Sequence, residues 1–254
     1  MKFAFVNGQR HEAEPKLSGN CLGCGNPMTA KCGALRLWHW AHKGSHLCDP
    51  WWESETDWHR AWKDQFPVAW QEIRHPVDDG SCHIADVRTD QGWVIEFQHS
   101  QIRPEERRSR EAFYSRMIWV VNANRLQRDR AQLANAYNNG VSLVPGSLLR
   151  KAYAGDCRAL REWAGGSTPI FFDLGRDQPL MYLLPRTESA SVYVHPVARE
   201  QIIEWHRSPE SKAATEFAIF VTELPQLIGA FESRPRSPAV QLPLLRARPR
   251  HRRF

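Results

Sequence analysis

Two carboxylates and one carboxamide occupy matched positions in neighbouring strand-like segments, and these residue types are suited to binding a metal ion. The segments HIADVRT and WVIEFQ are joined by a three-residue loop that ends at Gly92, and hairpin loops of this length commonly carry Gly in the left-handed conformation. A ladder centred on Gln91 places Asp86 opposite Glu96, with their Cβ atoms roughly 4.5–5.5 Å apart. Because side chains alternate along a strand, Gln98 lies on the same face as Glu96.

This arrangement predicts a site for a hard divalent cation. Opposed carboxylates repel each other and destabilise a strand pair unless a cation lies between them. Mg²⁺ and Mn²⁺ prefer carboxylate and carbonyl oxygens, and the backbone carbonyl of Phe97 lies beside the pair. Such an ion can assist the attack of water on a phosphodiester. The alternative is an exposed sheet face with ordinary polar residues, but Asp86 and Glu96 stand within the apolar runs IADV and VIEF, where an unpaired charge is costly.

A preceding segment supplies further polar groups at helical spacing. Trp and Phe residues recur every three or four positions in residues 51–70, which predicts an amphipathic helix. Glu55, His59 and Lys63 follow one another at four-residue steps and would share one face of that helix. Glu55 could then complete the metal site through a water, with His59 or Lys63 close to a substrate phosphate or to the attacking water. The alternative is a solvated, salt-bridged helix face.

A cysteine- and histidine-rich segment precedes this helix. Cys21 and Cys24 are separated by two residues, as are His39 and His42, and this spacing is typical of ligands to a tetrahedral zinc ion. Cys48 could replace His39 as a ligand. A structural zinc would explain how a short, loop-rich segment folds, since metal binding contributes folding free energy directly. The alternative is an accidental cluster of buried thiols and surface imidazoles.

A charged segment that begins at Pro104 predicts a second helix, because Pro is favoured in the first helical turn. Arg107, Arg110 and Tyr114 fall on one face of it and could hold a DNA strand through phosphate contacts and aromatic stacking. Pairing of the arginines with glutamates of the same helix is the alternative. The apolar run MIWVVNAN that follows predicts a buried, parallel strand. The segment 126–165 is expected to be mainly helical, PIFFDLG and PLMYLLP to be a strand pair, and VHPVAREQIIEWHRS to be a helix.

The positive charge of the chain is concentrated at its end. The chain carries 34 Lys and Arg against 28 Asp and Glu, for a net charge of +6, and residues 234–254 contain seven arginines and no acid. Subtracting those seven charges leaves −1, so the remainder is not basic. We expect this proline-rich tail to be unstructured and to attract nucleic acid through salt-sensitive contacts of Arg246, Arg248, Arg250, Arg252 and Arg253. A solvated end that aids solubility is the alternative.

Length and composition exclude several classes of protein. With 254 residues, 42% hydrophobic and 24% charged, the chain can form a folded core of one large or two small domains. It contains no run of about 18 apolar residues, which argues against a membrane-spanning helix. Its N-terminal segment is too polar for a signal peptide, and six cysteines in this length do not make a disulfide scaffold. We therefore expect a cytoplasmic protein.

The chemistry-bearing segments together resemble a known family. The stretch from Cys21 to Asn124, with its motifs CLGCG, HWAHK, ESETDWHRAWK, IADV, VIEFQHSQI and MIWVVNA, resembles the nuclease-like family of competence protein CoiA. That family is similar to the PD-(D/E)XK, or restriction-endonuclease-like, superfamily. The resemblance implies an α/β fold with a mixed central sheet flanked by helices, preceded by a small zinc-finger-like segment. It also implies metal-dependent cleavage of DNA.

The resemblance assigns roles to particular residues. Glu55 matches the family's helix glutamate, Asp86 matches the acidic residue of its D-V strand, and Glu96 with Gln98 matches its E-x-Q pair. Asp86, Glu96 and Glu55 would bind Mg²⁺ or Mn²⁺, and Gln98 would position the nucleophilic water. The wider superfamily has lysine where this chain has Gln98, and an amide cannot carry that positive charge. The missing cation could come from His59, Lys63 or Arg107.

These observations divide the chain into four parts. Residues 1–50 form the N-terminal strand and zinc-finger-like segment, 51–125 the nuclease-like core, 126–233 a C-terminal α/β extension of unknown role and 234–254 the basic tail. We predict a metal-dependent nuclease that acts on incoming or foreign DNA. The alternatives are a non-catalytic, zinc-containing, nucleic-acid-binding accessory protein and a zinc-stabilised scaffold. Protein partners and a homodimer are compatible with each of these.

Overall fold

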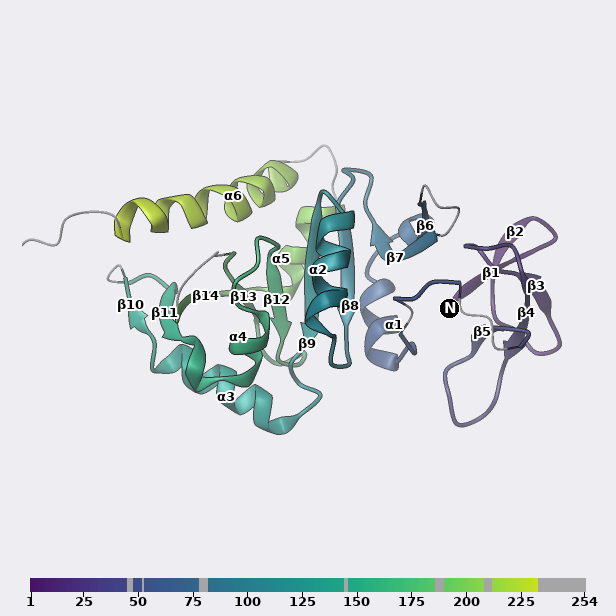
Figure 1. The fold of residues 1–254 in the computed structure, drawn as a ribbon, viewed down its shortest axis with the longest axis horizontal. Coiled ribbons are helices and arrows are strands. Elements are labelled where there is room, and N and C mark those ends of the chain that lie inside the picture. The colour runs from purple at the N-terminus through teal and green to yellow at the C-terminus, as the bar shows by residue number, and fades with distance from the viewer. Residues whose placement is uncertain are drawn as a thin grey trace, which may run out of the picture.

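Two β-sheets, with helices around the larger one, form the protein. The computed structural model describes residues 1–44, 48–51, 53–77, 82–143, 146–185, 190–207 and 212–232. In Figure 1 the smaller sheet lies at one end of the molecule, beside helix α1 (Asp57–Lys63), and the larger sheet lies at the centre. The basic tail, with Arg246, Arg248, Arg250, Arg252 and Arg253, lies outside the described residues.

The smaller sheet is antiparallel, with five strands in the order β2-β1-β3-β4-β5. The strands are β1 (Phe3–Val6), β2 (Gln9–Glu12), β3 (Ser18–Asn20), β4 (Pro27–Lys31) and β5 (His39–His42). Asn7 and Gly8 both have positive φ and make the tight turn between β1 and β2, as Asn-Gly pairs commonly do. Phe3, Met28 and Trp40 are buried in a small core against this sheet.

The larger sheet has nine strands in the order β10-β11-β14-β13-β12-β9-β8-β7-β6. The strands are β6 (Gln71–Pro76), β7 (Cys82–Arg88), β8 (Val94–Gln98), β9 (Met117–Asn122), β10 (Val141–Ser142), β11 (Arg150–Tyr153), β12 (Ile170–Asp173), β13 (Leu180–Leu183) and β14 (Ser191–Val197). β9 runs parallel to both β8 and β12, and the other neighbours are antiparallel. The prediction of an α/β protein with a mixed sheet is confirmed, as is the prediction that MIWVVNAN forms a buried parallel strand, here β9.

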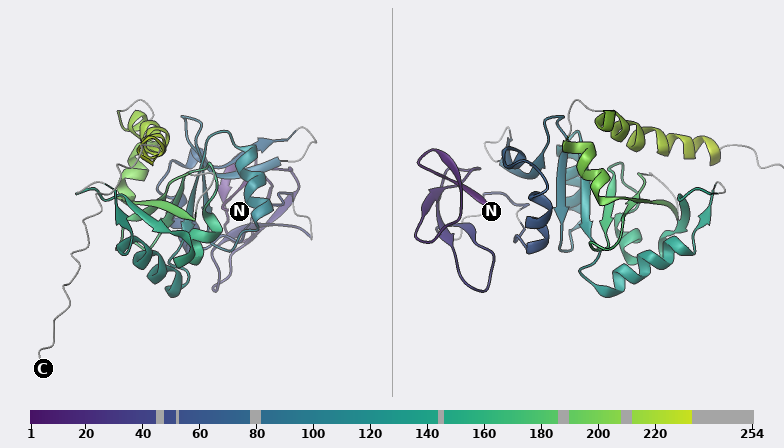
Figure 2. Two further views of the ribbon diagram at one scale, coloured as in Figure 1. Left: turned by 60° about the vertical axis from the view of Figure 1, so that its left-hand side comes forward. Right: turned by 180° about the vertical axis from the view of Figure 1, so that it is seen from behind.

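Helices cover both faces of the larger sheet. One face packs against α2 (Pro104–Phe113), α3 (Gln127–Asn138) and α4 (Arg158–Trp163), and the other against α1, α5 (Arg199–Arg207) and α6 (Lys212–Glu232). Strand residues alternate between these layers, so that Trp119 faces the first and Val120 the second. Figure 2 shows the layers from two further directions. Two short 3-10 helices, η1 (Val68–Trp70) and η2 (Ala154–Asp156), complete the fold of the described residues. Among the described residues, no helix is long and apolar enough to cross a membrane.

The hairpin that carries the acidic residues has the predicted register. Val87 pairs with Ile95, and the backbone N–H of Thr89 donates to the carbonyl of Trp93 at 2.9 Å. Gly92 has a φ of +78°, in the left-handed region expected at this position of the loop. Alternation of apolar residues around one turn glycine is therefore sufficient to predict this pairing.

The helix predicted over residues 51–70 is much shorter. It begins only after Thr56, whose hydroxyl accepts from the backbone N–H of His59 at 3.4 Å, while His59 Nδ1 accepts from the backbone N–H of Thr56 at 3.2 Å. This reciprocal pair is a capping box, with histidine in the position that glutamate usually takes. Glu55 therefore precedes the helix instead of sharing its face with His59 and Lys63.

The later part of the chain is also less helical than predicted. Within residues 126–165, β10 and β11 separate α3 from α4 and extend the sheet beyond β14. Gly140 and Gly146 lie in this interval, and glycine is less favourable than alanine in a helix by about 1 kcal/mol. The helix predicted over VHPVAREQIIEWHRS also begins later than expected. Its first residues, VHPV, form the end of β14, and α5 begins only at Arg199.

A buried carboxylate holds α1 against the sheet. Asp173, at the end of β12, accepts from the indole N–H groups of Trp58 and Trp62, each at 2.8 Å. Arg199 of α5 donates to the same carboxylate at 2.5 Å and lies over the Trp62 ring. With its tryptophans fixed in this way, α1 places Lys63 against the β7–β8 hairpin.

Candidate active site and metal centre

A cavity of about 300 Å³ lies between the N-terminal sheet on one side and strands β6, β7 and β8 with helices α1 and α2 on the other. Met28, Trp40 and His42 of the N-terminal sheet form part of its wall. The acidic residues predicted from the sequence all reach it, although they come from separate segments. Its charged and titratable lining includes Asp49, Glu53, Glu55, His59, Lys63, Glu72, Asp86, Glu96, Arg110 and Tyr114.

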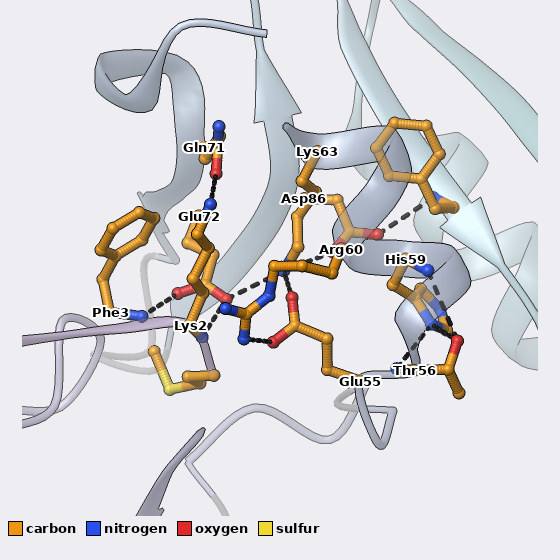
Figure 3. A network of polar contacts seen from close by, with 12 residues as sticks. Lys2, Phe3, Glu55, Thr56, His59, Arg60, Lys63, Gln71, Glu72 and Asp86 are labelled. Carbon is orange, nitrogen blue, oxygen red and sulfur yellow. Dashed lines mark hydrogen bonds and ion pairs between the residues drawn. The ribbon is translucent and has the colours of Figure 1, made fainter. Parts of the chain in front are cut away.

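Lys63 connects three carboxylates at this cavity, and Figure 3 shows it among its neighbours. Its Nζ lies 2.5 Å from Glu55 Oε1, 3.0 Å from Glu72 Oε1 and 3.8 Å from Asp86 Oδ1. Burial by itself lowers the pKa of this lysine, which is only 3% exposed, but the three carboxylates outweigh burial and hold the pKa above its usual range. Lys63 is therefore a permanent positive charge that faces three carboxylates.

Glu55 is paired with cations of the protein itself. Besides its contact with Lys63, it accepts from Arg60 Nη2 at 2.7 Å. Burial opposes its ionisation, but Lys63 and Arg60 outweigh burial and lower the pKa of Glu55 to about 2. Glu55 thus holds Lys63 in place, and cations of the protein already balance its charge.

At Asp86 and Glu96, side-chain carboxylates instead of backbone carbonyls accept hydrogen bonds from the neighbouring strand. Beyond the Val87–Ile95 pair, Glu96 Oε1 accepts from the backbone N–H of Asp86 at 3.3 Å. Asp86 Oδ2 in turn accepts from the backbone N–H of Phe97 at 3.0 Å. Each carboxylate thus crosses to the other strand, and the two are adjacent as the predicted register requires.

This carboxylate pair lacks sufficient positive charge around it. Burial raises the pKa of both groups, and repulsion from Asp86 adds to the effect on Glu96, whose pKa is raised to about 8. Arg110 Nη1, at 3.1 Å from Glu96 Oε2, offsets only part of this. Adjacent oxygen donors whose ionised forms are disfavoured by burial fit a hard divalent cation, because the cation stabilises those ionised forms.

Gln98 is bonded to Glu53 and not to the acidic pair. Its Nε2 donates to Glu53 Oε2 at 3.0 Å and to the carbonyl of Ser100 at 3.1 Å. Glu53 also accepts from the backbone N–H of Ser100 at 2.6 Å. Among the described residues, Glu53 lines the cavity and Gln98 does not. Gln98 is therefore hydrogen-bonded to the cavity lining through Glu53, a residue that no sequence pattern singles out.

His59 and Glu53 form a polar pair in the cavity wall. Because the backbone N–H of Thr56 donates to His59 Nδ1, the proton of the neutral ring lies on Nε2. That nitrogen is 3.6 Å from Glu53 Oε2. Burial raises the pKa of Glu53, but contacts with His59 and Ser100 outweigh burial, so the pKa lies below its usual value. The pair could exchange a proton with a ligand in the cavity.

Glu72, a further residue that sequence patterns miss, joins the N-terminal sheet to the cavity. Its two oxygens accept from the backbone N–H groups of Lys2 at 2.6 Å and Phe3 at 2.9 Å, and one of them also contacts Lys63 (Figure 3). Burial raises the pKa of Glu72, but Lys63, the N-terminal ammonium and the backbone N–H of Lys2 together outweigh burial, and the pKa lies below its usual value. One signal could have found it: Glu72 interrupts the apolar run VAWQEI as Asp86 interrupts IADV.

The α2 residues expected beside a DNA strand are largely buried. Arg107, Arg110 and Tyr114 are 8%, 6% and 6% exposed. Arg107 pairs with Glu111 at 2.7 Å and Arg110 with Glu106 at 2.6 Å, as the alternative interpretation of this helix expects. Helical spacing shows which residues share a face, but not whether that face turns to solvent or to the sheet. Arg110 and Tyr114 line the cavity, so a ligand could reach them only there.

A cysteine and histidine cluster at the N-terminal sheet has the composition of a zinc centre. The ligand atoms of Cys21, Cys24, His42 and Cys48 all lie within 4.8 Å of one another. Cys21 Sγ is 3.6 Å from Cys48 Sγ, and Cys24 Sγ is 3.4 Å from His42 Nε2. Thiolates and imidazole are the ligands that zinc prefers, so this cluster could hold a zinc ion.

Cys48, and not His39, belongs to this cluster. His39 and His42 begin and end strand β5, and side chains three residues apart on a strand point to opposite faces. His39 Nδ1 is instead bonded to the carbonyl of Leu37 at 2.8 Å. The set with His39 is therefore corrected to the alternative that contains Cys48. His42 and Cys48 also line the cavity, so a bound zinc would stabilise its wall.

We expect the purified protein to bind about one zinc ion per chain. Cys48→Ser should lose the metal, because serine is a poor zinc ligand, and His39→Ala should retain it. Metal content after dialysis, measured by mass spectrometry, distinguishes the two variants. His39 is a matched control because it stands on the same strand as His42. Zinc lost from His39→Ala but retained by Cys48→Ser would contradict the ligand set.

The raised pKa of Glu96 predicts a pH-dependent stability in the absence of divalent ions. The folded state binds this proton more tightly than the unfolded state, so the stabilisation is complete below pH 4.5 and is lost as the pH rises through about 8. In EDTA, the free energy of unfolding of wild type should therefore fall relative to Glu96→Gln across this interval. Each factor of ten by which folding tightens the binding of this proton corresponds to about 1.4 kcal/mol. Urea titrations at several pH values measure the fall, and a difference that is independent of pH would contradict the raised pKa.

Comparisons with known proteins add no relative. The chain matches no protein-family model, no curated protein and no solved structure. The chemistry of this cavity therefore follows from its own residues. These are a buried carboxylate pair short of positive charge, a charged lysine beside it, and a cluster in the wall that could hold zinc.

Proposed function

We propose that this protein is a metal-dependent nuclease that hydrolyses phosphodiester bonds in DNA. The observation that carries the proposal is the adjacency of the carboxylates of Asp86 and Glu96, with Lys63 beside Asp86 in the same cavity. Oxygen donors that are short of positive charge favour a divalent cation, and a buried ammonium favours a phosphate. A phosphodiester is an anion that gains further negative charge at the reacting phosphorus during hydrolysis, so this combination suits its cleavage.

The roles of the central residues follow from their contacts. Asp86 and Glu96 would hold Mg²⁺ or Mn²⁺, which supplies a Lewis acid and a more acidic bound water. Lys63 takes the part of the lysine that the superfamily has at position 98. It remains charged and lies 3.8 Å from Asp86 Oδ1, so it could stabilise a phosphate bound beside Asp86. Glu55 fixes the ammonium of Lys63 from another side.

The remaining polar residues position these groups or move protons. His59 Nε2 and Glu53 stand together in the cavity wall and could give or take a proton there. Gln98 and the backbone N–H of Ser100 orient the Glu53 carboxylate. Gln98 is therefore proposed as a positioning residue, in place of the direct role in orienting water that its place in the E-x-Q pair implies.

The resemblance to the CoiA nuclease-like family supports the same proposal. Glu55, Asp86 and Glu96 match motifs of that family, and they converge on one cavity from three separate segments. A mixed sheet flanked by helices is compatible with the PD-(D/E)XK architecture. On this basis the substrate is incoming or foreign DNA in a bacterial cell.

One observation favours a second function, that of a non-catalytic nucleic-acid-binding accessory protein. Side chains of the protein already neutralise part of the acidic set, since Glu55 is paired with Lys63 and Arg60, and Glu96 with Arg110. Pairing of this kind can be purely structural. The two functions differ in one measurable respect, because the accessory protein binds DNA without cleaving it.

Asp86→Asn should abolish DNA cleavage while leaving DNA binding nearly unchanged. Asparagine keeps the size of the side chain but removes one of the two charges that would hold the metal ion. We expect the cleavage rate to fall by about two orders of magnitude or more, the range found when one group that stabilises transition-state charge is removed. Single- and double-stranded DNA are incubated with Mg²⁺ or Mn²⁺, and binding is followed separately by fluorescence anisotropy.

Glu105→Gln is the matched control, because Glu105 is exposed on α2 and outside the cavity lining. It should cleave at the wild-type rate, and EDTA should stop cleavage by both proteins. Cleavage that survives in a folded Asp86→Asn variant would place the active site elsewhere. Binding without cleavage by folded wild type would support the accessory function.

A further inference from the structure

Positive charge gathers on the C-terminal extension, away from the cavity. α3 and α4 lie side by side, and the start of α3 borders a concave surface with α4 (Figures 1 and 2). Asp129 is the only acidic residue among the described residues that line this surface. Without its tail the chain has a net charge of −1, so such an accumulation is local. The basic residues of the surface are Arg125, Arg128, Arg158 and Arg161.

Much of this charge is available to a ligand. Arg125 and Arg128 are exposed, and neither makes an ion pair within the described part of the chain. Arg158 pairs with Glu162 at the surface, where solvent and salt screen an ion pair and keep it weak. Arg161 uses one nitrogen for the carbonyl of Gly155, at 2.8 Å. The guanidinium groups therefore retain N–H donors, in the planar arrangement that matches a phosphate.

The arginine surface is continuous with a second concave surface. The two share Arg125 and Arg158 in their linings, and the second extends to His99 and Ser100. These last two residues follow the carboxyl end of β8, and Asn122 at the carboxyl end of β9 lines the same surface. β8 and β9 are parallel, and the carboxyl ends of parallel strands are where open α/β sheets commonly bind ligands.

This second surface lies beside residues that line the cavity. The backbone N–H of Ser100 donates to Glu53, which lines the cavity, at 2.6 Å. The ring of His99 lies 5.7 Å from the ring of His59, which also lines the cavity. These contacts connect the arginine surface, through the second concave surface, with residues that line the cavity.

We propose that Arg125, Arg128, Arg158 and Arg161 bind the sugar–phosphate backbone of the DNA strand that reaches the cavity. The proposal rests on the nuclease function for the destination of that strand, and it gives the C-terminal extension a role in substrate binding. Contacts of arginine with phosphate position a strand without reading its sequence. The strand passes from the arginine surface over His99 and Ser100 to the carboxylate pair.

The full-length double variant Arg125→Ala, Arg128→Ala tests this surface, because both side chains are exposed and can be removed without disturbing the core. Binding of fluorescein-labelled single-stranded and duplex DNA is measured in EDTA by anisotropy over a range of salt concentrations. We expect binding to be about ten-fold weaker at about 0.1 M salt. The slope of log affinity against log salt should shrink by about two for the duplex, since each neutralised phosphate contributes about 0.9.

The double variant Arg103→Ala, Arg108→Ala is the matched control. It removes the same charge from positions that are 83% and 69% exposed near the start of α2 and outside both surfaces. We expect it to bind DNA within about two-fold of wild type. Equal weakening in both variants would show a general effect of charge and overturn the proposal, as would unchanged binding by the Arg125, Arg128 variant.

The assay separates this proposal from the nuclease function. The binding assay contains no divalent ion, so it measures DNA binding without cleavage. A protein that binds DNA through these arginines but never cleaves it, even with Mg²⁺ or Mn²⁺, would therefore contradict the nuclease function and leave the arginine surface supported. Wild-type protein that shows no salt-sensitive DNA binding overturns the arginine surface directly.

Discussion

The burial of a charged lysine among carboxylates is the interaction on which this molecule depends. A buried ammonium is costly unless it is fully paired, and Lys63 is paired with Glu55, Glu72 and Asp86. These partners come from the segment before α1, from β6 and from β7, so one charge gathers three parts of the chain. In the proposed function, the charge that fixes the cavity is also the one that would meet a phosphate. Stability and chemistry would then depend on the same residue.

The same network joins the two sheets. Glu72 contacts Lys63 and also accepts from the backbone N–H groups at the start of β1, so the N-terminal sheet is tied to the cavity by the carboxylate that pairs the lysine. A zinc ion held by the cysteine and histidine cluster would stiffen the part of the wall that contains His42 and Cys48, and Asp173 holds α1 against the larger sheet. Within this frame Asp86 and Glu96 are the carboxylates whose need for positive charge is least satisfied, as their raised pKa values indicate. A divalent cation is the simplest way to satisfy it.

The range of the interactions involved explains how much of this structure the sequence predicts. Alternation and Gly92 are local signals, so they predict the β7–β8 register and the adjacency of its carboxylates. The strand geometry of β5 excludes His39 from the ligand set that contains His42. The spacing of the cysteines and histidines does not reveal that these histidines lie on a strand. The places of Glu53 and Glu72 at the cavity depend on hydrogen-bond partners 45 and 70 residues away in the sequence. The burial of the α2 arginines depends on which face of the helix meets the sheet. No local pattern contains such information, although a charge within an apolar run marks Glu72 as it marks Asp86.

The proposed function requires Asp86 and Glu96 to form a divalent-cation site beside Lys63. Crystals of the full chain grown with Mn²⁺ can show this site by anomalous diffraction, because manganese and zinc are distinguished by their absorption edges. We expect a manganese peak within coordination distance of both carboxylates, separate from a zinc peak at Cys21, Cys24, His42 and Cys48. No manganese at the carboxylate pair under saturating Mn²⁺, or manganese bound only at other surface acids, would show that this pair is not a divalent-cation site.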